Sequence, residues 1–166
     1  MIKAELTLGE IAQLSVELNG SAGVTGIEGT AFKGLLNQSL PINKKYWLGK
    51  LAKTALDTAN HIGKLRDELI TKLGTENPKG QPEIQPMIVK LGKNKNPELD
   101  GKGNKIMIPN PVMELFGKEM NDLLEIKKEI TFPPFCIDDY TMSADEYYHV
   151  FFKLVDLSET QEPELV

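Results

Sequence analysis

The residues best suited to nucleophilic chemistry are one cysteine and two histidines. Cys136 is the only thiol of the chain, and His61 and His149 are the only imidazoles that could act as its base. Phe135 and Ile137 flank the cysteine, so we expect a buried, unreactive thiol whose role is packing. The sequence also lacks a Gly-x-Ser-x-Gly motif. We therefore predict no catalytic residue, and a protein that is not an enzyme.

Metal binding needs three or four ligands at an organised spacing, which the scattered histidines and cysteine do not supply. Two acidic pairs, Asp138-Asp139 and Asp145-Glu146, are the alternative for magnesium or for acid and base catalysis. Both have a simpler explanation, because aspartate favours turns and acidic residues favour the first turn of a helix. We predict neither a metal site nor a cofactor.

A glycine-rich run, GSAGVTGIEG, occupies residues 20–29. Glycine-rich loops hold phosphate when they follow a buried strand and, in a P-loop, end in Gly-Lys-Ser/Thr. Neither feature is present here, so the run is predicted to be a flexible connection.

The densest positive charge lies in residues 90–105, where only Glu98 and Asp100 are acidic. The lysines are Lys90, Lys93, Lys95, Lys102 and Lys105. No aromatic residue is interleaved with them, so stacking on nucleic-acid bases is not supported. We interpret the segment as a solvated loop, and the alternative is a site that binds an anion.

Two apolar segments are candidates for contact with another protein. Tyr46 and Trp47 open a predicted helix, either as an aromatic platform or as a lid over the core. Residues 130–137 read ITFPPFCI, in which the proline pair forbids a helix and restricts any strand to a sheet edge. Its candidate interaction residues are Pro133, Pro134 and Phe135.

The clearest element is a long helix over residues 43–73, closed by Gly74. Apolar residues recur in it at alternating spacings of three and four, as in a heptad seam. The seam comprises Leu48, Leu51, Ala55, Thr58, Ile62, Leu65 and Leu69, widened by Ala52, Leu56 and Ala59. A second helix, capped by Asn110 and starting at Pro111, runs to about residue 126.

The second helix is about half as long as the first, so part of the seam needs cover from other helices or from another chain. Where the two helices face each other we predict one shared core. Its expected members are Leu51, Ile62, Leu65, Phe116, Met120 and Leu123.

Shorter signals complete the predicted elements. Residues 2–6 alternate like a strand, and a capping box of Thr7 and Glu10 opens a helix that ends at residues 19–20. A short helix is expected over residues 31–40, and a hairpin over residues 84–109 with Asp100-Gly101 at its tip. The hairpin should pack on the helices or pair with residues 2–6. A capping box of Ser143 and Glu146 should open a terminal helix.

The predicted fold is mainly α with some β: an antiparallel long-helix pair, a short β-hairpin insertion and additional short helices. A chain of 166 residues fits one domain, here residues 1–157 with the insertion around 84–109, followed by an acidic flexible tail at 158–166. A net charge of −5 disfavours nucleic acid and anionic lipid as partners. The single cysteine, the lack of a secretion signal and the lack of a long apolar run favour the cytoplasm.

The phrases "LRDELITKLG", "DGKGNK" and "PNPVMELFGKEMNDLLEIKKEITFPPF" occur in an order that resembles small uncharacterised proteins of tailed bacteriophages. The resemblance covers roughly residues 40–135. It implies a viral protein located in the host cytoplasm. Such proteins share no agreed activity, so the resemblance assigns no site residues.

These features favour a non-enzymatic protein-interaction or assembly and accessory protein, whose surplus seam binds a protein partner or a second copy. The alternative is a ligand-binding or inhibitory protein. It would act on a host factor or sequester a small anionic molecule through the lysines of residues 90–105.

Overall fold

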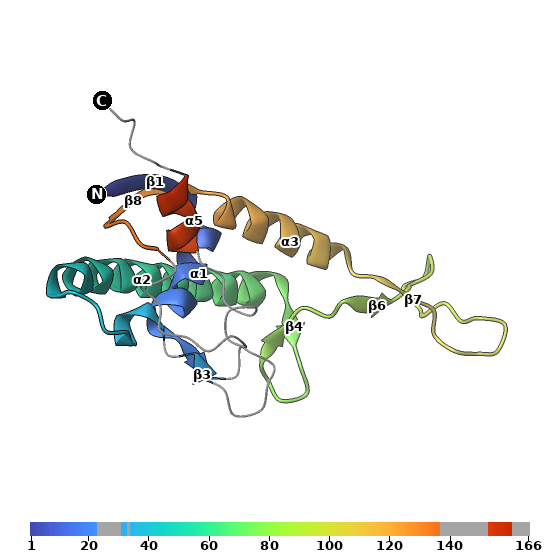
Figure 1. Cartoon of the computed structure of the whole chain (residues 1–166). Helices are drawn as coiled ribbons and strands as arrows, with labels where there is room; N and C mark the ends of the chain where they lie inside the picture. Colours follow the sequence, from blue (N-terminus) through green and yellow to red (C-terminus); the bar gives the residue numbers. More distant parts are fainter. Residues whose placement is uncertain (23–30, 33, 137–152, 161–166) are drawn as a thin grey trace. The chain divides into compact units, whose positions relative to one another are not determined.

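The computed structural model describes residues 1–22, 31–32, 34–136 and 153–160, and its elements form a mainly helical α+β fold, as predicted (Figure 1). The chain divides into two compact units. The first unit contains Met1–His61 and Leu124–Val166, and the second contains Ile62–Leu123. The second unit is larger than the predicted insertion, because it includes the last turns of one long helix and most of the next.

The sheet of the first unit pairs β1 (Ile2–Thr7) with β8 (Lys127–Phe132) in antiparallel register. The strand predicted from alternation at residues 2–6 is confirmed, and Ile2, Ala4 and Leu6 point into the core. Its partner is β8 and not the hairpin, contrary to one of our expectations. Strand β8 ends where Pro133 follows, because proline has no N–H to donate to a ladder.

Helix α1 (Leu8–Asn19) begins with the predicted capping box. The Glu10 N–H donates to Thr7 Oγ1 at 3.2 Å, and the Thr7 N–H donates to the Glu10 carboxylate at 2.9 Å. The helix ends at Gly20, whose φ of 80° favours glycine and whose N–H donates to the Val16 carbonyl. Ile11, Leu14 and Leu18 form its buried face.

The short helix predicted over residues 31–40 is wrong. Residues Ala31–Phe32 form strand β3 against β2 (Ser21–Ala22), and only a 3₁₀ turn, η1 (Leu35–Asn37), follows. Gly34 explains the break: its φ is 77° and a Cβ there would collide with the backbone of Gly20. The glycine-rich run falls largely on residues 23–30, which lie outside the described residues.

Helix α2 (Ile42–Leu73) confirms the predicted long helix. Its buried residues all lie in the first half and are Leu48, Leu51, Ala52 and Ala55. After α2, the N–H of Gly74 donates to the Ile70 carbonyl at 2.7 Å. A Cβ on Gly74 would lie 2.6 Å from the carbonyl oxygen of Glu83, so a close backbone approach requires glycine there.

Helix α3 (Pro111–Leu124) is confirmed together with its cap, because Asn110 Oδ1 accepts the Val112 N–H at 3.1 Å. The predicted shared core is wrong for all members except Leu51. Ile62, Leu65, Phe116, Met120 and Leu123 are only half-buried. Heptad spacing identifies which face of a helix is apolar, but it does not say what covers that face.

The buried core instead belongs to the first unit. It is formed by β1, α1, η1, the first half of α2, β8, Phe135 and helix α5 (Lys153–Glu159). Ser158 and Glu159 belong to α5, so the predicted tail boundary after residue 157 falls inside a helix. Ser158 Oγ accepts the Phe135 N–H at 3.0 Å and joins α5 to the segment after β8. The predicted capping box of Ser143 and Glu146 lies outside the described residues.

The second unit contains two hairpins. Strand β4 (Thr75–Glu76) pairs with β5 (Pro82–Glu83), and β6 (Met87–Val89) pairs with β7 (Met107–Pro109). The predicted hairpin of residues 84–109 is therefore confirmed. Two further bridges lie within it, between residues 91 and 97 and between residues 99 and 105.

A closed ring of backbone hydrogen bonds joins the two inner turns of this hairpin. The Lys90 N–H donates to the Ile106 carbonyl, Ile106 to Glu98, and Glu98 back to Lys90, at 2.8 to 2.9 Å. Residues 90, 98 and 106 are evenly spaced in the sequence, so residues 90–97 and 98–105 form a repeat in space. We call residues 87–109 the hairpin arm.

Candidate interaction surfaces

Cys136 is exposed, so the prediction of a buried thiol is wrong. The segment after β8 keeps a two-residue alternation: Pro133 and Phe135 are buried, whereas Pro134 and Cys136 are exposed. The side chain of Phe135 therefore points to the opposite side from the thiol. His61, one of the two histidines that could serve it as a base, is an exposed residue of α2.

Most of the metal-binding and acid–base candidates fall outside the part of the chain that the structure describes. Among the described residues, no group of three or more His, Cys, Asp or Glu side chains could hold a metal ion. The acidic pairs at residues 138–139 and 145–146, and His149, lie outside the described residues. None of the described helices is long and apolar enough to cross a membrane.

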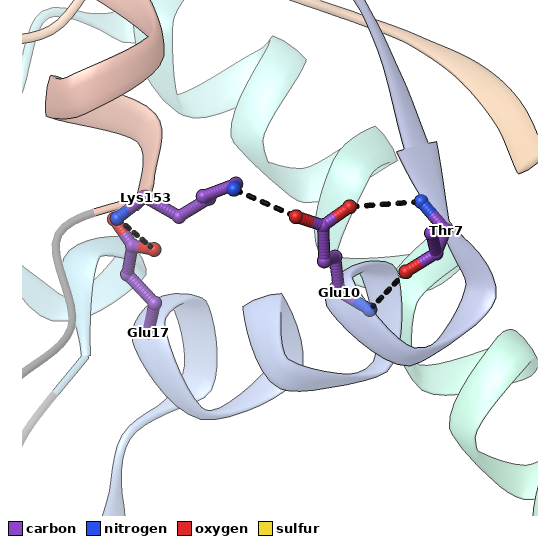
Figure 2. Close-up of polar contacts among 4 residues, drawn as sticks. All are labelled: Thr7, Glu10, Glu17 and Lys153. Atoms are coloured by element: carbon purple, nitrogen blue, oxygen red, sulfur yellow. Dashed lines mark hydrogen bonds and ion pairs between the residues drawn. The ribbon is translucent and has the colours of Figure 1, made fainter. Parts of the chain in front are cut away.

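A polar cluster that sequence reasoning missed joins α1 to α5 (Figure 2). The buried Glu17 carboxylate accepts the backbone N–H groups of Lys153 at 3.1 Å and Leu154 at 3.3 Å, across 136 and 137 positions of sequence. Lys153 Nζ donates to Glu10 Oε1 at 2.8 Å. A side chain of α1 thus satisfies N–H groups at the start of α5.

The electrostatics of this cluster indicate a structural role. The hydrogen bond from Lys153, followed by that from the Thr7 N–H, holds the pKa of Glu10 below its usual value. Both carboxylate oxygens of Glu10 and both of Glu17 accept hydrogen bonds from the protein. Because these oxygens already accept hydrogen bonds that link α1 to α5, the two carboxylates are poorly suited to exchange protons with a substrate.

The aromatic candidates Tyr46 and Trp47 pack edge to face, with ring centroids 5.5 Å apart. Lys50 Nζ lies 4.9 Å from the Tyr46 ring centroid and 5.0 Å from that of Trp47, a cation–π arrangement. Tyr46 is 58% exposed, so it is not a lid over the core. Trp47 is half-buried and borders a groove of about 180 Å³ between α2 and β8.

The proline segment offers less surface than its sequence implied. Phe135 is 3% exposed and Pro133 is buried, so both are core residues and not a contact surface. Pro134 is exposed and lines a shallow cavity of about 260 Å³ together with Lys44 and Cys136. Lys44 Nζ lies 5.0 Å from the centroid of the Phe135 ring.

The five candidate anion-binding lysines do not converge on a pocket. Lys90 is paired with Glu98 at 2.6 Å, within the ring of backbone hydrogen bonds. Lys93, Lys95, Lys102 and Lys105 are exposed, and none forms an ion pair with another described residue. Spread charges of this kind suit an extended partner better than a small anion.

The second unit has no core of its own. All of residues 62–123 are described, and none of their side chains is buried. Its apolar side chains line a surface groove of about 240 Å³ between the end of α2, β5 and α3. The groove is bordered by Ile70, Pro82, Glu83, Ile84, Met113 and Phe116.

The comparisons with protein-family models, with curated proteins and with solved structures gave no match.

Proposed function

We propose that this chain is a non-enzymatic assembly protein that binds a second copy of itself through the second unit. One observation supports the proposal: residues 62–123 contain two helical segments with apolar faces but no buried side chain. We call the half-buried apolar residues of these segments the helical face. They are Ile62, Leu65, Leu69, Ile70, Leu73, Val112, Met113, Phe116, Met120 and Leu123.

The energetics favour a partner. Ordering one residue costs about 1–2 kcal/mol in backbone entropy, and this cost is offset mainly by burying apolar surface. Burial contributes about 25 cal/mol per Å². In the first unit, fully buried side chains such as Phe132 and Leu18 provide it. In the second unit, a comparable stabilisation by apolar burial requires another chain that packs on the helical face.

A second copy is the occupant that the helical face fits best. A twofold axis would place the second half of α2 and the whole of α3 against the same segments of the other copy, which is the helix-on-helix arrangement of a four-helix bundle. The groove beside Phe116 offers a place for an apolar side chain of that copy. The resemblance to small tailed-bacteriophage proteins stays a prediction, and an accessory role in a viral assembly agrees with this proposal.

Light scattering on the full chain tests self-association directly. We expect a mass that is a multiple of 18.5 kDa. Phe116→Glu should reduce the mass to that of the monomer, because it places a charge on the helical face. Glu119→Gln, on the exposed side of the same helix, should leave the mass unchanged. Circular dichroism checks that both variants keep their helix content.

Dye binding separates the other outcomes. A monomeric wild type that does not bind an apolar dye would contradict any exposed apolar face. If the wild type is monomeric and binds the dye, and Phe116→Glu binds less of it, the partner of the helical face would be a different protein and not a second copy. If the wild type and the folded Phe116→Glu variant have the same oligomeric mass, the copies associate through a surface other than the helical face.

A further inference from the structure

Three tight turns of the second unit share one hydrogen-bond pattern. In each five-residue turn, the N–H of the first residue donates to the carbonyl of the fifth residue. The N–H of the fourth residue donates to the carbonyl of the first. The turns span residues 77–81, 92–96 and 100–104. The fourth residue has a φ of 75° at Gly80, 58° at Lys95 and 83° at Gly103. Two of the three turns therefore have glycine where the backbone favours it.

Lys95 is the exception, and it is the only non-glycine residue with positive φ in the described part of the chain. A long side chain is strained in this conformation, and such strain often marks a site where the side chain itself is used. The equivalent turn shows that glycine fits the same hydrogen bonds, because Gly103 occupies this place. A lysine at this position therefore points to a role for its ammonium group.

The arm also exposes apolar side chains at equivalent positions. Leu91, Leu99 and Met107 follow the three members of the backbone ring and are 55%, 57% and 48% exposed. Their recurrence at equivalent positions of the arm offers three apolar contact points to a partner. They alternate in sequence with the tips that carry Lys93, Lys95 and Lys102.

The turns fix the backbone that carries these side chains. Asp100 Oδ1 accepts the N–H groups of Lys102 at 2.8 Å and Asn104 at 2.9 Å, inside the turn that already has two backbone hydrogen bonds. The hydrogen bonds from Asn104 and Lys102 hold the pKa of Asp100 below its usual value. An ordered surface loses less conformational entropy on binding than a flexible one.

We propose that the hairpin arm binds an acidic segment of another protein, one in which apolar side chains alternate with carboxylates. Lys93, Lys95, Lys102 and Lys105 would pair with the carboxylates. Leu91, Leu99 and Met107 would contact the apolar side chains. This surface shares no residue with the helical face, so it does not depend on self-association.

A protein segment fits the arm better than nucleic acid does. The arm has no aromatic residue to stack on bases and no arginine for bidentate contacts with phosphate. Exposed leucines at every repeat have no use on a phosphate backbone, whereas they match apolar side chains of a peptide.

Fluorescence anisotropy with labelled probes and the full chain tests the proposal. The main probe is a peptide in which leucines are spaced among glutamates. The controls are an all-glutamate peptide of equal charge and an oligo-thymidylate. We expect the glutamate–leucine peptide to bind most tightly and to bind more weakly as salt is raised. Tighter binding of oligo-thymidylate would overturn the assignment, and equal binding of the two peptides would overturn the role of the leucines.

Matched variants localise the binding. Replacing Lys93, Lys95, Lys102 and Lys105 by Gln should weaken binding about tenfold, as expected when several exposed charge contacts are lost together. Replacing Lys64 and Lys72, exposed lysines of α2, should have no effect. Equal affinity of the wild type and the four-lysine variant would overturn the proposal.

Lys95→Gly provides the sharpest comparison, because glycine relieves the backbone strain. We expect this variant to unfold at a higher temperature and to bind the glutamate–leucine peptide more weakly. Higher stability with unchanged binding would show that the lysine is not used for binding. Lower stability would show that the lysine is retained for folding, and would also overturn the proposal.

Discussion

At the scale of single residues, side-chain direction decides reactivity. Cys136 has apolar neighbours in sequence, yet the alternation of the extended segment turns its thiol outward while Phe135 is buried. A thiol reagent at neutral pH should therefore modify the native protein at a rate close to that of an unstructured cysteine peptide. Cys136→Ser should change the free energy of unfolding by less than about 0.5 kcal/mol, as surface substitutions do. Modification only after unfolding would show a buried thiol.

Replacing Gly63 or Gly74 by alanine should change the stability of the protein in opposite directions. At Gly74 the added Cβ would lie 2.6 Å from two carbonyl oxygens, so Gly74→Ala should destabilise by about 1–3 kcal/mol. At Gly63, inside α2, the added Cβ would meet nothing within 4 Å apart from its chain neighbours and the nearby helix backbone, and Gly63→Ala should stabilise by up to about 1 kcal/mol. Chemical denaturation of both variants checks the signs. A stabilising Gly74→Ala would mean that the chain after α2 is not held close to Glu83.

At the scale of elements, one polar cluster attaches α5 to α1. Glu10 accepts hydrogen bonds from Thr7 of its own capping box and from Lys153 of α5, while Glu17 accepts the first N–H groups of that helix (Figure 2). The capping box is a local interaction that begins α1. The Glu10 carboxylate also accepts a hydrogen bond from Lys153 of α5, so this residue stabilises both the start of α1 and the contact between α1 and α5.

The lowered pKa of Glu10 makes this attachment sensitive to acid. A carboxyl whose pKa is lower in the folded state stabilises the protein above its unfolded pKa, near 4.5, and loses that contribution as the pH falls through the folded value. The melting temperature of the wild type should therefore fall more steeply on acidification below about pH 4.5 than that of Glu10→Gln. Glu119→Gln, on the exposed side of α3, should follow the wild type. Parallel curves for the wild type and Glu10→Gln would contradict the attachment.

At the scale of the whole molecule, burial is distributed unevenly along one helix. The buried residues of α2 lie before His61, where the division between the two units falls, and none lies after it. Hydrogen exchange should therefore show amide protection that decreases along α2 past residue 61 when the protein is dilute. Protection of residues 62–123 should rise with protein concentration if a second copy covers the helical face. Uniform protection of α2 in dilute solution would contradict the unit division.

The sequence by itself determined the elements whose signals are local. The capping box of Thr7 and Glu10, the heptad spacing of residues 48–69 and the Asn110-Pro111 helix start each act within a few residues. Such signals depend on residues that are close together in the sequence, so the pattern predicts where each helix lies. The prediction of a short helix at residues 31–40 was wrong for a local reason as well. It was based on apolar spacing alone and did not take account of the positive φ of Gly34.

Only the tertiary structure decided which of these elements share a core. The pairing of β1 with β8 and the contact of Glu17 with the start of α5 join distant parts of the chain, and neither has a counterpart in local spacing. The apolar faces of α1 and α3 look equally suited to burial in sequence, yet α1 is in the core and no side chain of α3 is buried. The physical reason is that periodicity records which side of a helix excludes water, whereas burial depends on the surface that another segment or another chain brings to it.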